Sequence, residues 1–156
     1  MKLLLSSVLL ITSININAYQ VQLMSNWCWV SAIQNVLGQV GIYEQQVNIA
    51  ARLDGLPRNR PAGLHEVKRL INSYGIPAVW AGRSATAEEL FFSLNNGKRV
   101  IALVRPSRGP VGHFVVLQSI TRQGVVTVFD PGTGATTYQH INQLYQMRWQ
   151  DAVVVG

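Results

Sequence analysis

The sequence predicts an α+β fold in which a helical N-terminal half packs on an antiparallel sheet formed by the C-terminal half. Between residues 28 and 97, apolar residues recur at the spacing of amphipathic helices. From residue 100 onward, they form short runs rich in valine and isoleucine that turn-forming residues separate. Helices followed by strands along a chain are typical of the α+β class.

Composition indicates one compact domain. The chain has 156 residues, of which 48 % are apolar and only 13 % are charged. This balance is typical of a folded globule and argues against disorder. A domain of this length buries about two thirds of its unfolded surface, so its core can stabilise it without disulfides.

The first eighteen residues have the layout of a secretory signal peptide. Met1-Lys2 gives a positive start, residues 3–11 give a short apolar core, and Ala18 is a small residue of the kind signal peptidase requires. A membrane anchor is the alternative, but spanning a bilayer takes roughly 20 apolar residues and polar residues interrupt this run. We therefore expect residues 1–18 to be removed and residues 19–156 to form a single exported domain, periplasmic or secreted.

The first helix is predicted from four apolar residues that share one face: Trp29, Ile33, Val36 and Leu37. Ser25 or Asn26 can cap its start, and Gly38 can end it. A second, short helix is expected over residues 44–53, before a loop that contains glycine and two prolines.

Two further helices follow. Apolar residues at helical spacing predict a third helix over residues 64–74, ended by Gly75. Residues 86–89 (Thr-Ala-Glu-Glu) form a capping box, so a fourth helix should begin there and end at residues 95–97.

The second half of the chain predicts a sheet. Four strands are expected, over residues 100–104, 113–120, 125–129 and 152–155. The tight turn at residues 121–124 joins the second and third of them into a hairpin. A short helix is expected over residues 141–147.

The charge of the chain argues against nucleic-acid binding. The formal net charge is +6, and Lys2 would leave with the signal peptide. The basic residues are scattered, apart from a small cluster at Arg52, Arg58 and Arg60, and no basic run is interleaved with aromatic residues. A solvated face explains this charge most simply, and attraction to an anionic cell surface or to an acidic substrate is the alternative. We expect a monomer.

Cys28 is the only cysteine, so it cannot form an intramolecular disulfide. It is either an inert buried thiol or a reactive one. It lies in the first turn of the first helix, where free backbone N–H groups and the helix dipole stabilise a thiolate. A structural cysteine would be expected within the apolar stripe instead, so the position favours a nucleophile.

A cysteine nucleophile needs a base, and three histidines are available. His65 lies beside Glu66 on the third predicted helix and should be exposed. His140 opens the late helix, where a polar first-turn residue is ordinary. His113 differs from both, because it begins an otherwise apolar strand directly after a glycine-containing loop.

The hairpin brings a carboxylate to His113. If its turn centres near residues 121–123, Asp130 falls opposite His113 or Val115. Residues 113 and 115 share a face of the strand, so Asp130 lies on the side of His113 in either register. Neighbours at these positions are within about 5–8 Å, close enough for Asp130 to orient the imidazole. The alternative is that Asp130 serves only the turn that follows it.

Gln22 precedes Cys28 by six residues. Its amide could join the Cys28 backbone N–H in binding the oxyanion of a tetrahedral intermediate. Spacing alone does not distinguish it from Gln20 or Gln34, which are equally available.

Together these motifs resemble the papain-like cysteine peptidases. Gln22, followed by Trp27-Cys28-Trp29, is similar to the papain pattern, and Gly112-His113-Phe114 with Asp130-Pro131 is similar to its small bacterial branches. These branches include the domains that trim double-glycine leaders. The resemblance implies a papain-like fold and cysteine peptidase activity.

The resemblance also implies a role for each motif residue. Cys28 would be the nucleophile, His113 the general base, Asp130 the residue that orients it, and Gln22 the oxyanion donor. One departure leaves the substrate open, because leader-trimming domains usually have Cys-Gly-Pro where this chain has Cys28-Trp29-Val30.

Three further residues are candidates for substrate binding: Trp27, Trp29 and Gly112. For the two tryptophans, a place in the core is the alternative to the cleft wall. We assign no metal ligands and no cofactor.

The function expected from the sequence is hydrolysis of peptide bonds in a peptide or protein substrate, through a Cys-His-Asp triad and an acyl-thioester intermediate. The same triad could serve an amidase acting on cell-wall peptides, a deamidase or a transamidase. A peptide-binding module without catalysis is a further alternative, although such a domain would be expected to have lost its nucleophile or base.

Overall fold

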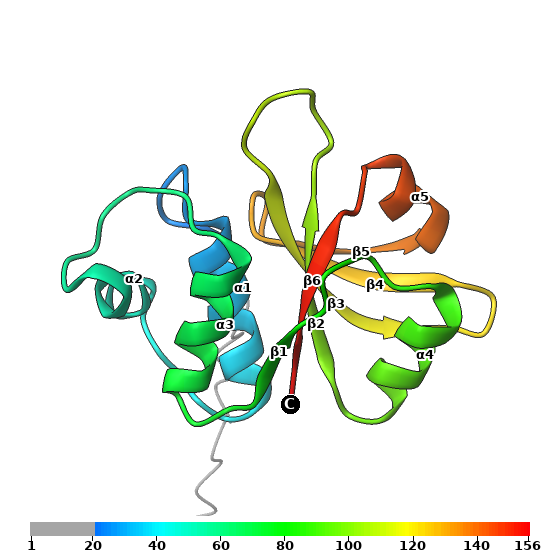
Figure 1. Ribbon diagram of the computed structural model, residues 1–156, viewed down its shortest axis with the longest axis horizontal. Helices are drawn as coiled ribbons and strands as arrows, with labels where there is room; N and C mark the ends of the chain where they lie inside the picture. The colour runs from blue at the N-terminus through cyan, green and yellow to red at the C-terminus, as the bar shows by residue number, and fades with distance from the viewer. Residues whose placement is uncertain (1–20) are drawn as a thin grey trace, which may run out of the picture.

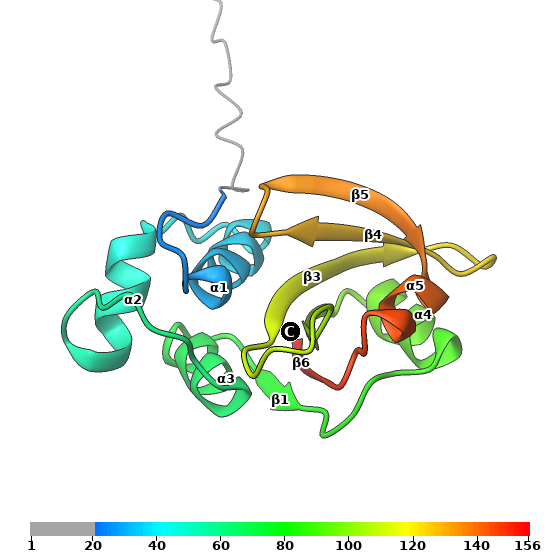
Figure 2. The ribbon, with the colours of Figure 1, turned by 90° about the horizontal axis from the view of Figure 1, so that it is seen from above.

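A computed structural model describes residues 21–156 and has the α+β architecture expected from the sequence. Helices α1–α3 lie on one side of a six-stranded sheet, and α4 and α5 lie on the other (Figure 1). Figure 2 shows that β3, β4 and β5 are strongly curved. The predicted signal peptide, residues 1–18, lies outside the described residues.

The N-terminal helices follow the predicted pattern. They are α1 (Cys28–Gln39), α2 (Gln46–Asp54) and α3 (Leu64–Ser73). No helix in residues 21–156 combines the length and apolar character needed to cross a membrane.

The start of α1 differs from the prediction. Its N-cap is Trp27, which makes no side-chain cap bond, so neither Ser25 nor Asn26 caps the helix. Asn59 engages both residues instead: its Oδ1 accepts from the Asn26 backbone N–H at 3.0 Å, and its Nδ2 donates to Ser25 Oγ at 3.0 Å. Among residues 21–156, no capping side chain therefore accepts from the first N–H groups of α1.

The sheet is antiparallel throughout, in the order β1-β6-β2-β3-β4-β5. Its strands are β1 (Ala78–Trp80), β2 (Arg99–Val104), β3 (His113–Ile120), β4 (Val125–Asp130), β5 (Ala135–His140) and β6 (Asp151–Val155). The remaining helices are α4 (Ala87–Asn95) and α5 (Ile141–Gln146). The two edge strands, β1 and β5, were not predicted.

Both faces of the sheet are buried, which explains why β2 and β3 are continuous apolar runs. Phe114 and Val116 pack with α1–α3 on one face, whereas Val115 and Leu117 pack with Leu90 of α4 on the other. Successive side chains of a strand point to opposite faces, so each strand contributes to both cores.

The β3–β4 hairpin has the register that the sequence predicts. Val116 pairs with Phe129 and Leu117 with Val128, before an irregularity at residue 118. Continued by one residue, this register puts Asp130 opposite Val115 and on the same face as His113. The prediction that Asp130 and His113 share a face is confirmed.

Candidate active site

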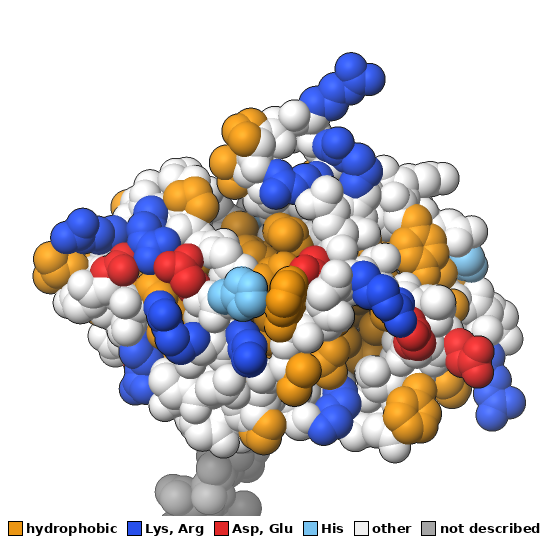
Figure 3. Space-filling model, viewed as in Figure 1, with side chains coloured by type: hydrophobic (Ala, Val, Ile, Leu, Met, Phe, Trp, Pro, Cys, Tyr) orange, Lys and Arg blue, Asp and Glu red, His pale blue; other side chains and the backbone are white. Residues whose placement is uncertain are grey.

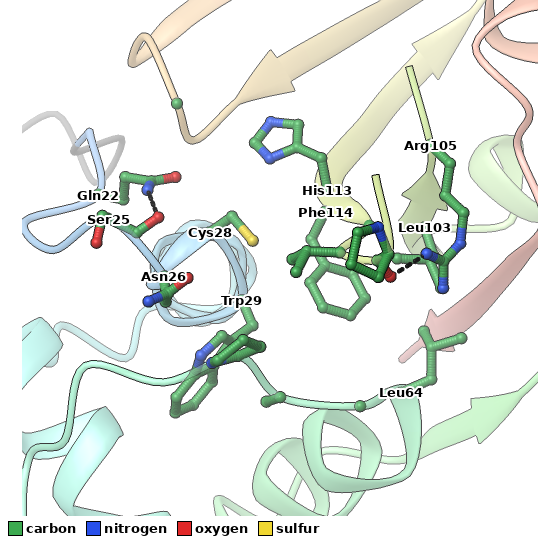
Figure 4. Close-up of a pocket in the computed structure, with 17 residues that line it drawn as sticks. Gln22, Ser25, Asn26, Cys28, Trp29, Leu64, Leu103, Arg105, His113 and Phe114 are labelled. Atoms are coloured by element: carbon green, nitrogen blue, oxygen red, sulfur yellow. Dashed lines mark hydrogen bonds between the residues drawn. The ribbon is translucent and has the colours of Figure 1, made fainter. Parts of the chain in front are cut away.

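Cys28 is the first residue of α1 and lines a pocket of about 540 Å³. His113, the first residue of β3, lines the same pocket. Figure 4 shows the Cys28 sulfur and the His113 ring on facing sides of it. Folding thus brings together two side chains that lie far apart in the sequence, on the helical layer and on the sheet.

His113 is held by Asp130 from the neighbouring strand. Its Nε2 lies 2.6 Å from Asp130 Oδ1, and that oxygen also accepts a hydrogen bond from the Gly132 backbone N–H at 2.8 Å. The Cys28 side chain also acts on His113 and favours its protonated form. Since Asp130 engages Nε2, Nδ1 is the ring nitrogen left for the sulfur.

These contacts set the charge of the imidazole. Burial by itself lowers the pKa of His113, but the hydrogen bond with Asp130 and the interaction with Cys28, together with the charges of both groups, outweigh it and raise the pKa to about 9. The hydrogen bond from His113 holds the pKa of Asp130 below its usual range. An imidazolium is therefore favoured at neutral pH, between a carboxylate and a sulfur.

Two glycines let the backbone approach the site closely. A Cβ on Gly132 would lie 3.2 Å from Asp130 Oδ1 and 3.5 Å from His113 Cε1. A Cβ on Gly112 would lie 2.5 Å from Leu103 Cδ1 and 3.4 Å from the Val104 carbonyl oxygen. Gly112 lines the pocket, as a substrate-binding residue must, and its lack of a side chain keeps the pocket wall close to β2.

Gln22 also lines the pocket, but its amide nitrogen is engaged elsewhere. Nε2 donates to the carbonyl oxygens of Met24 and Ser25, at 3.0 and 2.9 Å. Oε1 is buried and has no hydrogen-bond partner among residues 21–156. An oxyanion role for Gln22 therefore requires its side chain to turn from these carbonyls toward the substrate.

A buried glutamine that we did not single out from the sequence holds the segment around Gln22. Gln46 is 1 % exposed, its Nε2 donates to the Val21 carbonyl oxygen, and its Oε1 accepts from the Leu23 backbone N–H, both at 3.0 Å. On the other side, the Gln22 backbone N–H donates to the Pro131 carbonyl oxygen at 2.9 Å. Residues 21–23 are thus fixed between α2 and the turn that follows Asp130.

The two tryptophans beside Cys28 position a loop. The indole N–H groups of Trp27 and Trp29 donate to the carbonyl oxygens of Arg58 and Arg60, each at 2.9 Å. Trp29 lines the pocket although it is 1 % exposed, whereas Trp27 is 3 % exposed and is not among the lining residues. The prediction that Trp27 binds substrate is therefore wrong. Trp27 belongs to the core, because its indole is buried and its N–H group binds the Arg58 carbonyl oxygen.

The other two histidines lie outside the pocket lining. His65 is exposed and packs against Trp80, with 4.4 Å between the centroids of the two rings. Trp80 Nε1 in turn donates to Asp151 Oδ2 at 2.6 Å. His140 caps α5 by accepting from the Asn142 backbone N–H. Within residues 21–156, no group of three or more His, Cys, Asp or Glu side chains could hold a metal ion.

Comparison with solved structures identifies the fold. The chain is similar to a protein described as a C39-like peptidase from Bacillus anthracis, with a TM-score of 0.69, 16 % identity, and coverage of 90 % of this chain and 94 % of that one. It is also similar to the peptidase domain of Streptococcus ComA, a bifunctional ABC transporter of a quorum-sensing pathway. That match has a TM-score of 0.66, 12 % identity, and coverage of 88 % of this chain and 96 % of that one.

The sequence itself places the chain in a family. No curated protein matches it, but the profile of the Peptidase_C39 like family matches residues 14–154, nearly its whole length. Three observations indicate the same family: the papain-like architecture, the match to the family profile, and the cysteine that faces a histidine in the pocket. The chain belongs to the Peptidase_C39 like family and is a cysteine-type peptidase that acts on a peptide or protein substrate.

Proposed function

We propose that the protein is an exported peptidase that hydrolyses peptide bonds through a Cys28-His113-Asp130 triad and an acyl-thioester intermediate. The observation that carries this proposal is the 2.6 Å contact of His113 Nε2 with Asp130 Oδ1, in a pocket that Cys28 and His113 both line. A nucleophile, a base and a residue that orients the base are the elements of such a triad.

In the first half of the reaction, the Cys28 thiolate attacks the carbonyl carbon of the scissile bond. A carbon–sulfur bond forms, and the carbonyl oxygen becomes an oxyanion. His113, protonated at Nδ1, then gives this proton to the leaving nitrogen as the carbon–nitrogen bond breaks. The amine product departs and leaves a thioester on Cys28.

In the second half, water replaces the amine. His113 Nδ1, now neutral, takes a proton from the water molecule that attacks the thioester carbon. The carbon–sulfur bond breaks, the acid product leaves, and the thiolate and imidazolium are restored. Asp130 keeps Nε2 protonated throughout, so Nδ1 remains the nitrogen that exchanges protons.

The oxyanion would be stabilised by the backbone N–H of Cys28 and by Gln22. Cys28 is at the open start of α1, where backbone N–H groups lack intrahelical acceptors. Gln22 joins them once substrate draws its Nε2 away from the carbonyl oxygens of Met24 and Ser25.

Comparison of the wild type with Cys28→Ala and His113→Ala on a peptide-library digest tests the proposal. Each variant should lose activity by several orders of magnitude, and the double variant should lose little more, because the two residues act as a unit. A digest that also contains cell-wall fragments separates peptide hydrolysis from amidase activity. Unchanged cleavage by Cys28→Ala would overturn the proposal.

A further inference from the structure

Apart from Cys28 and His113, the pocket is lined by one ionisable side chain. Of the 17 residues drawn in Figure 4, Arg105 is the only one that is aspartate, glutamate, lysine or arginine. Its Nε donates to Gln150 Oε1 at 2.5 Å, and its Nη1 donates to the carbonyl oxygen of Pro110. Both acceptors are neutral, so these contacts hold the guanidinium in place without compensating its charge.

Two further arginines lie on or against the same loop. Arg148 Nε donates to the Arg105 carbonyl oxygen at 2.8 Å, and Arg108 lies in the same β2–β3 loop. Within residues 21–156, ion pairs of arginine are made by Arg60 and Arg83 and by none of these three. Figure 3 shows basic side chains over this loop, at the top of the view, with no acidic side chain beside them.

Much of the pocket wall is apolar. The lining residues Leu64, Leu103, Val111 and Phe114 share this character. A pocket that combines an apolar wall with an uncompensated guanidinium fits a side chain with a methylene stem and a terminal carboxylate.

We propose that the pocket selects a peptide substrate with an acidic side chain close to the scissile bond, and that Arg105 binds its carboxylate. Glutamate is favoured over aspartate because its longer stem covers more of the apolar wall. This inference rests on the proposed function, whose substrate it specifies.

Arg105 also supports the β2–β3 loop, so removing it alone cannot distinguish charge recognition from loop support. Gln150→Ala is the matched control, because it removes the acceptor of Arg105 Nε and leaves the guanidinium charge. Arg105→Glu is the second variant, because charge reversal should transfer the preference to a basic side chain, which loop support cannot do.

The experiment uses fluorogenic peptides in which each position on either side of a central bond is in turn Glu, Gln or Lys. At one position, the wild type and Gln150→Ala should cleave the Glu peptide about 10-fold faster than the Gln peptide. Arg105→Ala should abolish this ratio, and Arg105→Glu should favour Lys. Equal cleavage of Glu and Gln peptides at every position, or a preference that survives Arg105→Ala, would overturn the inference.

Binding of the same peptides to the Cys28→Ala protein separates this inference from the proposed function. Fluorescence anisotropy should give a Kd for the Glu peptide about 10-fold below that for the Gln peptide. The Cys28→Ala/Arg105→Ala double variant should bind the two peptides with equal Kd values. If no peptide is cleaved, the proposed function fails and the Kd ratio still decides the role of Arg105. Equal Kd values would refute that role.

Discussion

At the scale of single residues, the contact between His113 and Asp130 controls the charge of the site. The pKa of His113 is raised to about 9, so its imidazolium, the proton donor of the proposed reaction, persists until the pH passes this value. We therefore predict that kcat/KM falls as the pH rises through about 9. In Asp130→Ala this fall should move to lower pH, because a hydrogen bond that raises the pKa of His113 is lost. A pH–rate profile of both proteins checks this, and an unmoved alkaline limb would contradict it.

The raised pKa of His113 also makes the stability of the folded protein depend on pH. The pKa of His113 in the folded protein lies above the ordinary value of 6.5, so its stabilising contribution is complete below that pH. The contribution is lost as the pH rises through about 9. Denaturant unfolding over this range should show a decline in the wild type that His113→Ala lacks.

Gly132 gives a second prediction at this scale. A methyl group there would lie 3.2 Å from Asp130 Oδ1, closer than most such contacts, and should displace the carboxylate from His113. Gly132→Ala should lower kcat/KM several-fold while the melting temperature changes little. Gly109→Ala is the control, since its Cβ would meet only Ser107 Oγ at 3.5 Å. Equal kinetics for the two variants would show that the close contact does not matter.

The residues of the proposed triad were predictable because each has a local signal. Cys28 is unique and opens a helix, His113 interrupts an apolar run, and hairpin register places Asp130 beside it. Gln46 has no such signal. It is one glutamine among many, and its three hydrogen bonds connect segments that only the tertiary fold brings together.

At the scale of elements, Gln46 links α2 to the segment that carries Gln22. Gln46→Ala would leave the Val21 carbonyl oxygen, the Leu23 N–H and Gln34 Oε1 without this partner. We predict a loss of about 1–3 kcal/mol in the free energy of unfolding and a fall in kcat larger than any change in KM. Urea unfolding and steady-state kinetics measure the two effects.

Gln45→Ala is the matched control for Gln46, because Gln45 is exposed and makes no side-chain cap bond to α2. If Gln46 acts through Gln22, its substitution should change kcat little in a Gln22→Ala background. Additive losses in the double variant would show that Gln46 acts by another route.

The elements that the sequence failed to predict are those that lack its usual signals. β1 has only three residues, and β5 (Ala-Thr-Thr-Tyr-Gln-His) is an almost entirely exposed edge strand without alternating apolar residues. The predicted caps of α1 were wrong because Asn59, distant in sequence, binds Ser25 and Asn26. The capping box of α4 was right, because both of its partners, Thr86 and Glu89, are local.

At the scale of the whole molecule, the site lies where the helical layer meets the sheet. α1 supplies the sulfur, β3 the imidazole and β4 the carboxylate, so the active arrangement depends on the packing of both layers. Phe114, next to His113, belongs to the core shared with α1. Local propensity predicts each element, but the approach of the two layers is a property of the fold.

Export is a further prediction at this scale. The layout of residues 1–18 predicts cleavage after Ala18, so mature protein recovered from the periplasm or medium should begin at Tyr19. Mass spectrometry of the intact protein measures this. Recovery of the protein from the cytoplasm with residues 1–18 still attached would contradict export.

The most direct test of the account is the rate at which a thiol-directed epoxide alkylates Cys28, the only cysteine of the chain, as a function of pH. We predict that the wild type reacts far faster than free cysteine at about pH 6, where an ordinary thiol is almost fully protonated. His113→Ala should lose most of this excess over free cysteine. If the wild type at this pH reacts no faster than free cysteine, Cys28 and His113 do not form the charged pair on which the proposed function depends.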